Sequence, residues 1–387
     1  MRNTLVLVII SLVFILYGTI NYYIGIRGWQ SLGRFVPFLN SKLYWLVFWA
    51  VALSYLAARL GENYLPTGLH RAVTNIGAYW LAAMFYFLLI LLIIDLVRLL
   101  DRWFHLIPAA VKAHPGAAGI AGLAVLGLVA AIVVYGAWNA RHPRVTHYDI
   151  SIAKKAGDLK ELHVVAVSDV HLGTLIHNGR LTRMVDMING LQPDIVLMPG
   201  DVIDEDVEAK AGVEMAANFR RIESRLGVYS VPGNHEYIGG RFSDVLRYLE
   251  NAGVTVLRDR SVKIADSFYV VGRDDLSGRR FGGQPRKELP DLLDGIDRSL
   301  PLILLDHQPV NLAASAKAGI DLQLSGHTHQ GQLFPINFIT GRMYETDWGH
   351  LKKGNFQLIV STGYGTWGPP IRTGNRPEIV DIVIRFK

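Results

Sequence analysis

The sequence predicts an α/β domain preceded by a transmembrane region of about four helices. The chain has 387 residues, of which 50% are hydrophobic, more than most soluble proteins contain and enough for two or three domains. Four apolar stretches occupy the first part, and short apolar runs then alternate with polar helical stretches. We therefore expect a transmembrane region at residues 1–143, a linker at 144–160 and the α/β domain at 161–387.

Each of the four apolar stretches approaches or exceeds the roughly 20 residues that a helix needs to cross a bilayer. The first follows Arg2, but no small-residue cleavage site comes after it, so we expect a retained span rather than a signal peptide. The fourth is rich in glycine, which allows either close helix packing or simply a slim span. Asp95 and Arg98 are expected to pair on one helix face near the interface. The expected spans are residues 4–26, 43–60, 72–97 and 117–138.

The net charge of +6 comes from the transmembrane region alone. Residues 1–143 hold ten Lys or Arg and three Asp or Glu, a net charge of +7, whereas residues 144–387 hold 29 and 30, a net charge of −1. Lys and Arg commonly flank membrane spans, and the α/β domain lacks the basic stripe that binds nucleic acid. We therefore expect a lipid bilayer, and no nucleic acid, among the partners.

The expected orientation depends on the loop charges, because four spans place both ends of the region on one side. Seven Lys or Arg lie on the side of the α/β domain and six on the other. This difference of one charge favours a multi-pass protein of the cell membrane with its α/β domain in the cytoplasm. The seven are Arg2, Arg59, Arg71, Arg141, Arg144, Lys154 and Lys155; the six are Arg27, Arg34, Lys42, Arg98, Arg102 and Lys112.

Six apolar runs in the α/β domain are expected strands, and five of them run into loops with residues able to bind a metal. In α/β sheets, ligands bind beyond the carboxyl ends of the strands, so these loops are expected to converge. One Asp or His after a strand is usually a turn or interior residue, but five such loops indicate a site. The strands are residues 162–168, 194–198, 227–231, 268–271, 301–305 and 321–324.

The chain has no cysteine, so any metal must be held by His, Asp, Glu or Asn. The five loops offer seven carboxylate, imidazole and amide donors, which suit Mn, Fe or Zn, with Mn favoured, better than Ca. Seven donors suffice for two divalent ions that share a carboxylate, and such ions clamp both oxygens of a displacement at phosphorus and acidify bound water to a hydroxide nucleophile. The candidate ligands are Asp169, His171, Asp201, Asn234, His307, His327 and His329.

His235 and Asp204 are the candidate catalytic side chains. His235 follows Asn234 and is not needed as a ligand, so it can protonate the leaving oxygen as a general acid. Asp204 lies three residues after Asp201, where its carboxylate can orient the imidazole and raise its pKa.

In their order along the chain, the motifs DxH, GDxxD, GNH(D/E), H and GHxH resemble those of the calcineurin-like metallophosphoesterases, over residues 160–386. The resemblance implies a four-layered αββα sandwich, with helices outside two packed sheets, and a metal-dependent phosphoric ester hydrolase. It also implies how the ligands divide. One ion takes Asp169, His171, Asp201 and His329, and the other takes Asp201, Asn234, His307 and His327.

The chain also resembles a bacterial membrane-associated branch of this family. The resemblance rests on GRDD at 272–275, HQP at 307–309 and GxGxxGPPxRxxxRPEI at 363–379. Many relatives read GHTHGGQ, whereas this chain has Gln330 at the first of the two glycine positions. That change leaves every ligand in place but is expected to narrow the site or alter a substrate contact.

The substrate is expected at the membrane. Members of the family cleave phosphomonoesters, phosphodiesters, nucleotides and lipid-linked pyrophosphates, so the motifs predict a reaction and not a substrate. A short linker from the last span raises the effective concentration of membrane-bound substrates. We therefore favour a phosphodiester or pyrophosphate of a lipid or lipid-linked head group. Trp348, Tyr364 and Trp367 either contact an acyl chain or base, or pack under loops.

Residues 277–289 allow two interpretations. Basic side chains, including Arg286, surround Phe281, and Gly282 and Gly283 can serve as hinges, so the segment is either a lid over anionic head groups or a solvated loop.

Two other functions stay open. A transporter or scaffold whose domain only binds a ligand is disfavoured because no metal ligand is missing. A nuclease using the same metals is disfavoured by the −1 charge of the α/β domain.

Overall fold

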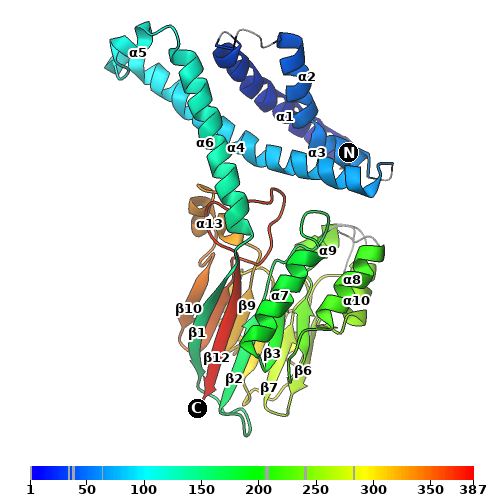
Figure 1. Cartoon of the computed structure of the whole chain (residues 1–387). Helices are drawn as coiled ribbons and strands as arrows, with labels where there is room; N and C mark the ends of the chain where they lie inside the picture. The colour runs from blue at the N-terminus through cyan, green and yellow to red at the C-terminus, as the bar shows by residue number, and fades with distance from the viewer. Residues whose placement is uncertain are drawn as a thin grey trace. The chain divides into compact units, whose positions relative to one another are not determined.

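The computed structural model describes residues 2–33, 35–36, 40–62, 64–204, 209–238, 242–281 and 284–387. The chain divides into two compact units, residues 1–137 with 368–370, and residues 138–367 with 371–387. We call the first the helical region and the second the α/β domain, and describe each by itself (Figure 1).

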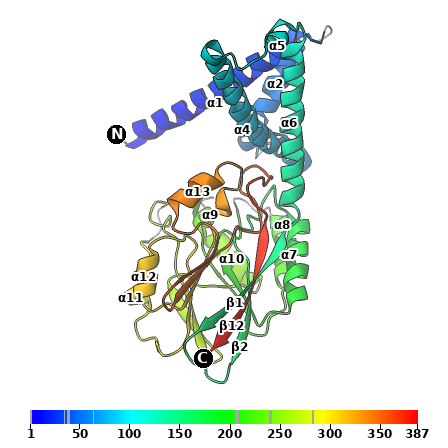
Figure 2. The same ribbon diagram turned by 90° about the vertical axis from the view of Figure 1, so that its left-hand side faces the viewer.

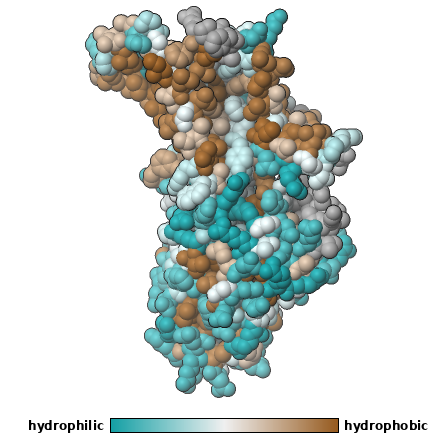
Figure 3. Space-filling model, viewed as in Figure 1, coloured by the Kyte–Doolittle hydropathy of each residue, from teal (hydrophilic) through white to brown (hydrophobic). Residues whose placement is uncertain are grey.

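Long apolar helices make up the helical region. In the described part of the chain, three helices are long and apolar enough to cross a membrane: α1, α4 and α6. The pair α2 and α3, bent by 51°, qualifies together as a fourth, broken span. Much of the visible surface of this region is accordingly hydrophobic (Figure 3). The helices are α1 (Arg2–Leu32), α2 (Ser41–Ala52), α3 (Ser54–Leu60), α4 (Thr67–Phe104), α5 (Ala109–Ala113) and α6 (Ala117–Ala140).

The carboxylate of Asp95 in α4 contacts side chains of α1 as well as Arg98 of its own helix. Its carboxylate accepts hydrogen bonds from the Tyr23 hydroxyl, at 2.7 Å, and from Arg27, and it lies 3.7 Å from Arg98. The expected pair with Arg98 is therefore present, but the closer partners belong to another helix. An apolar environment favours this arrangement, because a carboxylate there needs hydrogen-bond donors that water does not supply.

The glycines of α6 allow close packing at only some positions. A Cβ atom at Gly119 or Gly122 would lie 2.3 Å from Phe35 or 2.4 Å from Ser31, whereas nothing lies within 4 Å of Gly127. Of the two alternatives, close packing is therefore found at Gly119 and Gly122, and the open surface at Gly127 fits the other.

Two six-stranded sheets form the α/β domain. Their strand orders are β1-β12-β2-β3-β4-β5 and β10-β11-β9-β8-β7-β6, and the central strands of both are parallel. The first sheet contains β1 (Arg144–Ile152), β2 (Glu161–Ala166), β3 (Ile195–Pro199), β4 (Val228–Val231), β5 (Thr255–Val256) and β12 (Glu378–Phe386). The second contains β6 (Arg260–Ile264), β7 (Phe268–Gly272), β8 (Leu302–Leu305), β9 (Leu322–Ser325), β10 (Gly349–Lys353) and β11 (Phe356–Val360).

Apolar side chains on both faces of each sheet produce four layers. Successive residues of a strand point to opposite faces; Val164 of β2 packs between the sheets, and Val165 packs under the outer helices. Figure 2 shows helices on both outer faces of the paired sheets. The predicted αββα sandwich is confirmed. The helices on the first sheet are α7 (Asn178–Leu191), α8 (Ala209–Phe219) and α10 (Phe242–Asn251), and those on the second are α11 (Leu289–Leu292) and α12 (Leu312–Lys317).

The predicted linker at 144–160 is wrong for its first half, which is strand β1. This strand pairs in parallel with β12 over its whole length, from Arg144 opposite Glu378 to Ile152 opposite Phe386. Three residues, 141–143, separate it from the end of α6. The prediction failed because the run RVTHYDISI carries many polar residues, and its partner strand lies more than 200 residues away in the sequence.

Candidate metal centre

The five loops that follow strands β2, β3, β4, β8 and β9 converge as predicted. β2, β3 and β4 are parallel neighbours in one sheet, and β8 and β9 in the other, so their carboxyl ends share an edge. Hydrogen bonds join the loops of the two sheets. Nδ1 of His307 lies 2.8 Å from the carbonyl oxygen of Pro199, and the backbone N–H of His327 donates to Asp169 at 3.0 Å.

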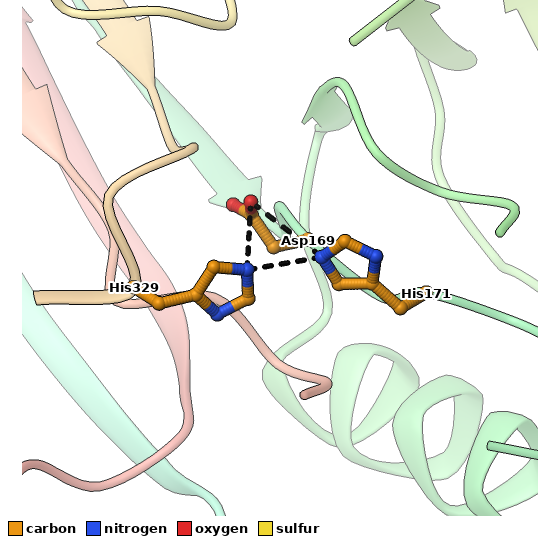
Figure 4. A group of neighbouring side chains, drawn as sticks. All are labelled: Asp169, His171 and His329. Atoms are coloured by element: carbon orange, nitrogen blue, oxygen red, sulfur yellow. Dashed lines mark hydrogen bonds and ion pairs between the residues drawn. The ribbon is translucent and has the colours of Figure 1, made fainter. Parts of the chain in front are cut away.

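Asp169, His171 and His329 form the first group of candidate ligands. Nε2 of His171 lies 2.9 Å from Nε2 of His329, which is 3.3 Å from Oδ1 of Asp169, and all three side chains are buried (Figure 4). Burial lowers the pKa of His329 to about 4; the charge of Asp169 opposes this shift, and those of His171 and Arg372 add to it. The ring is therefore neutral at pH 7, as a metal ligand must be.

Asp201, Asn234, His307 and His327 form the second group. Oδ2 of Asp201 lies 3.0 Å from Nε2 of His307. Oδ1 of Asn234 lies 3.2 Å from that nitrogen and 2.8 Å from Nδ1 of His327. With Nδ1 of His307 hydrogen-bonded to the Pro199 carbonyl, Nε2 would have its lone pair available for a metal ion. The structure thus brings together all four residues that were predicted for the second ion.

Asp201 lies between the two groups, as a shared ligand must. Its Oδ2 is 3.9 Å from Nε2 of His171 in the first group, besides its contact with His307 in the second. Burial acts to raise the pKa of Asp201, but the nearby His307, His171 and His235 lower it to about 2. The carboxylate is therefore ionised at neutral pH, which agrees with the predicted bridging role.

Backbone strain is concentrated in this site. A left-handed residue other than glycine costs roughly 1–2 kcal/mol, and such residues cluster at functional sites. Tight glycine packing maintains the conformation: a Cβ atom at Gly326 would lie 2.0 Å from Oδ2 of Asp169, and one at Gly233 would lie 2.1 Å from Oδ1 of Asp201. The candidate ligands with left-handed backbone are Asp169 (φ 53°), His171 (52°), Asp201 (52°), His327 (71°) and His329 (45°).

The predicted acid pair is in contact. Nδ1 of His235 is hydrogen-bonded to Oδ1 of Asp204, and the same oxygen lies 3.3 Å from Nδ1 of His171. Asp204 therefore orients a predicted ligand as well as the acid, a role the sequence did not indicate. Burial acts to lower the pKa of His235, but the Asp204 hydrogen bond and the charges of Asp201 and Asp204 raise it to about 9. His235 is thus protonated at neutral pH, as an acid requires.

Glu236 ties the loops after β3 and β4 together. Its buried carboxylate accepts hydrogen bonds from the backbone N–H groups of Val202, Ile203 and Gly233, at 2.6, 3.0 and 2.7 Å. Burial and the charge of Asp201 raise the pKa of Glu236 to about 7. The motif GNH(D/E) marks this residue in the sequence, but only the structure shows which N–H groups it binds.

Arg372 and Asn375 hold His329 from behind, and the sequence did not place them there. The fully buried Arg372 has Nη2 at 3.0 Å from Nδ1 of His329, and it also donates to the carbonyl oxygens of Gly363 and Gly365. Asn375 donates to the carbonyl oxygen of His329. The segment after the GxGxxG motif therefore holds both the imidazole ring and the backbone of His329 in place.

Gln330 adopts a conformation that suits glycine, with φ 44° and ψ 41°. We expect Gln330→Gly to raise the free energy of unfolding by up to about 1 kcal/mol. Glycine adopts the left-handed conformation without the strain that a Cβ atom causes there. The shift in melting temperature of the metal-loaded protein measures this. Gln330→Ala keeps the strain and serves as the control; a Gly variant less stable than the Ala variant would contradict the expectation.

The donors fit two divalent ions. In the described chain, the His and Asp groups able to hold a metal are Asp169/His171/His329, Asp201/His307/His327 and the overlapping His171/Asp204/His235. The first two combine imidazole with ionised carboxylate and, through Asn234, an amide oxygen, which is the donor chemistry of Mn, Fe or Zn. Asp204 in the third group is better explained as the partner of two imidazoles.

A four-layered αββα fold with two such groups at its strand ends is the architecture of metallophosphoesterases. Residues 162–331 match the family model described as Calcineurin-like phosphoesterase, and the chain belongs to this metallophosphoesterase family.

The chain is similar to proteins from bacteria and animals. An uncharacterized metallophosphoesterase of Aquifex aeolicus is 34% identical over 247 residues, which cover 63% of this chain and 92% of that protein. Proteins named "Transmembrane protein with metallophosphoesterase domain" are 33% identical in Danio rerio, over 67% of this chain, and 31% identical in Bos taurus, over 68%. The matches cover 62% and 60% of the length of those two relatives.

Both interpretations of residues 277–289, a lid and a solvated loop, are wrong for Arg286. Its side chain is only 7% exposed and binds Asp306 at 2.9 Å. The proposed hinges Gly282 and Gly283 lie outside the described residues.

The three aromatic residues also differ from one another. Tyr364 is buried beneath Arg180 of α7, and the half-buried Trp348 donates to Glu378 of β12 at 3.0 Å, so both make contacts inside the domain. Trp367 is exposed, and its ring centre lies 6.4 Å from that of His235.

Proposed function

We propose that this protein is a membrane-anchored two-metal phosphoesterase that hydrolyses a phosphodiester or pyrophosphate of a lipid or lipid-linked head group. The observation that carries the proposal is the meeting of seven ligands in two groups around Asp201, beside the pair of His235 and Asp204. Two divalent ions, with Mn favoured, and an α/β domain on the cytoplasmic side complete the proposal.

The side chains divide the chemistry among them. When bound, the ions would polarise the phosphoryl group and acidify water. Asp201 supplies the negative charge between the two ion positions. His235 keeps its Nδ1 hydrogen bond to Asp204, so its proton at Nε2 is free to move to the leaving oxygen. Both side chains of the pair are partly exposed, and substrate reaches them from that side.

The short connection between the apolar helix α6 and the α/β domain favours a lipid substrate. The three residues 141–143 join α6 to β1. Such a short tether keeps the site near the bilayer and raises the effective concentration of membrane-bound phosphoesters. A soluble substrate would gain nothing from it.

The proposal predicts a specific product. Purified full-length protein with Mn²⁺ is incubated with extracted membrane lipids and nucleotide-linked lipids, and mass spectrometry identifies what is consumed. We expect a lipid phosphomonoester to appear, and we expect Asp201→Asn protein to release none. Hydrolysis of nucleic acid alone would replace the proposal with a nuclease, and ligand binding without any turnover would replace it with a transporter or scaffold.

A further inference from the structure

Large apolar side chains are exposed beside the metal centre. The described α/β domain exposes nine of them, and five belong to the segment after His329 or to Trp367. The helix α13 (Asn337–Met343) carries three of the five. Exposed clusters of this kind mark interaction sites in soluble domains. We call the five the rim patch: Phe334, Phe338, Ile339, Met343 and Trp367, each between 49% and 70% exposed.

The rim patch flanks the open side of the site. Tyr344, directly after Met343, has its ring centre 6.3 Å from that of the ligand His327. On the other side, Trp367 lies beside His235. These two histidines belong to the partly exposed part of the centre, whereas Asp169 and its group are buried. The rim patch therefore lies beside the partly exposed histidines of the centre.

The rim patch is hydrogen-bonded to the segment that holds the end of α6. The backbone N–H of Phe334 donates to the Thr373 hydroxyl at 3.0 Å, and Gln332 exchanges hydrogen bonds with the backbone of Trp367 at 3.1 and 3.2 Å. Within the α/β domain, Asn139 in the last turn of α6 donates to the carbonyl oxygens of residues 372 and 375, at 2.9 and 2.7 Å. Residues 138–140, the part of α6 that belongs to the α/β domain, therefore lie close to the rim patch.

Strand pairing leads to the same conclusion. Arg144, the first residue of β1, lies opposite Glu378 of β12. Near that end of β12, Val380 lies opposite Ala166, the last residue of β2 before the site. The chain therefore enters the domain at the sheet edge that carries the metal centre. Trp138, which is 54% exposed at the end of α6, is typical of a membrane interface.

We propose that the rim patch inserts into the interfacial layer of the bilayer and turns the mouth of the metal centre towards the lipid head groups. Aromatic and aliphatic side chains next to arginine favour this layer, where apolar faces sink about 5–10 Å. The exposed Arg342 and Arg376 supply the positive charges for anionic head groups. A bilayer is favoured over a second copy of the chain because the first residues of the domain, 138–140, continue an apolar helix and lie near the patch. The inference deepens the proposed function and rests on its lipid substrate.

The absence of native cysteine allows a direct test by single labels. Phe338→Cys, Met343→Cys and the control Lys155→Cys are each made in the full chain, labelled with an environment-sensitive fluorophore and placed in nanodiscs of phosphatidylcholine and phosphatidylglycerol. Lys155 is exposed and lies between β1 and β2, at the opposite edge of the sheet. We expect a blue shift and loss of most fluorescence with doxyl-labelled lipids at positions 338 and 343, and neither at 155.

The outcomes separate the inference from the proposed function. Labels at 338 and 343 that are quenched no more than the label at 155 would overturn the inference. A blue shift without lipid quenching would also overturn it, in favour of contact with another protein copy. Retained hydrolysis of bis-p-nitrophenyl phosphate shows that the variants are folded. If wild-type protein shows no hydrolysis at all, the proposed function fails, while lipid quenching still reports on the patch.

Discussion

Asp201→Asn is expected to lower kcat for metal-dependent phosphodiester hydrolysis by roughly 10³-fold or more, since clamping by two ions contributes several kcal/mol. The Asp201 carboxylate lies within 3.9 Å of an imidazole nitrogen from each group, so its loss affects both ion positions. Asparagine keeps the shape and tolerates the left-handed φ of 52° at this position, so the effect reports the charge rather than the fold. Hydrolysis of bis-p-nitrophenyl phosphate measures the fall in kcat, and mass spectrometry measures the metal content.

Asp194→Asn provides the matched control. Asp194 precedes the same strand, β3, at its other end, where it accepts a hydrogen bond from the backbone of His163 and pairs with Arg225, both at 2.9 Å. We expect this variant to keep wild-type activity and metal content. Full activity in Asp201→Asn protein would rule out a shared ligand at that position.

His235→Ala is expected to lower kcat by roughly 10²- to 10⁴-fold for substrates with poor leaving groups. The loss should be much smaller for p-nitrophenolate, which departs without a proton. Metal content should survive, because the His235 side chain is hydrogen-bonded to Asp204 and is not one of the seven candidate ligands. His147→Ala, which removes another histidine paired with an aspartate but on the surface of β1, is the control and should leave kcat unchanged. Metal loss from the His235 variant would mean that His235 is a ligand.

The pH dependence of the same reaction tests the acid pair. His235 acts in its protonated form, and its pKa is raised to about 9, so activity on poor leaving groups should persist at neutral pH and fall as the pH rises through that region. Asp204→Asn removes the hydrogen bond and charge that raise this pKa, so the alkaline fall should move to lower pH. Metal content must be checked in parallel because Asp204 also contacts His171. If activity of the Asp204→Asn protein falls at the same alkaline pH as that of the wild type, His235 and Asp204 do not act together as the general acid.

The strand-end motifs were predictable because each depends on a short local pattern. An apolar run followed by Asp201 or by His327 needs only neighbouring residues to be recognised, and parallel strands bring such ends together in any α/β sheet. The supporting residues had no such pattern. Arg372 reaches His329 across 43 positions, and Glu236 reaches the backbone of Asp201 across 35. Contacts at such separations depend on how loops pack, which periodicity does not encode.

The sequence by itself determined the apolar helices, the α/β class and the seven candidate ligands, because hydrophobic patterning and ligand chemistry are carried by residue type and spacing. Tertiary structure alone decided that Asp204 serves two histidines, that Arg372 orients His329, and that residues 144–152 are a strand rather than a linker. It also placed the exposed apolar side chains of the rim patch beside the site. Each of these depends on pairing between distant segments, where the gain in burial and hydrogen bonding outweighs weak local preference.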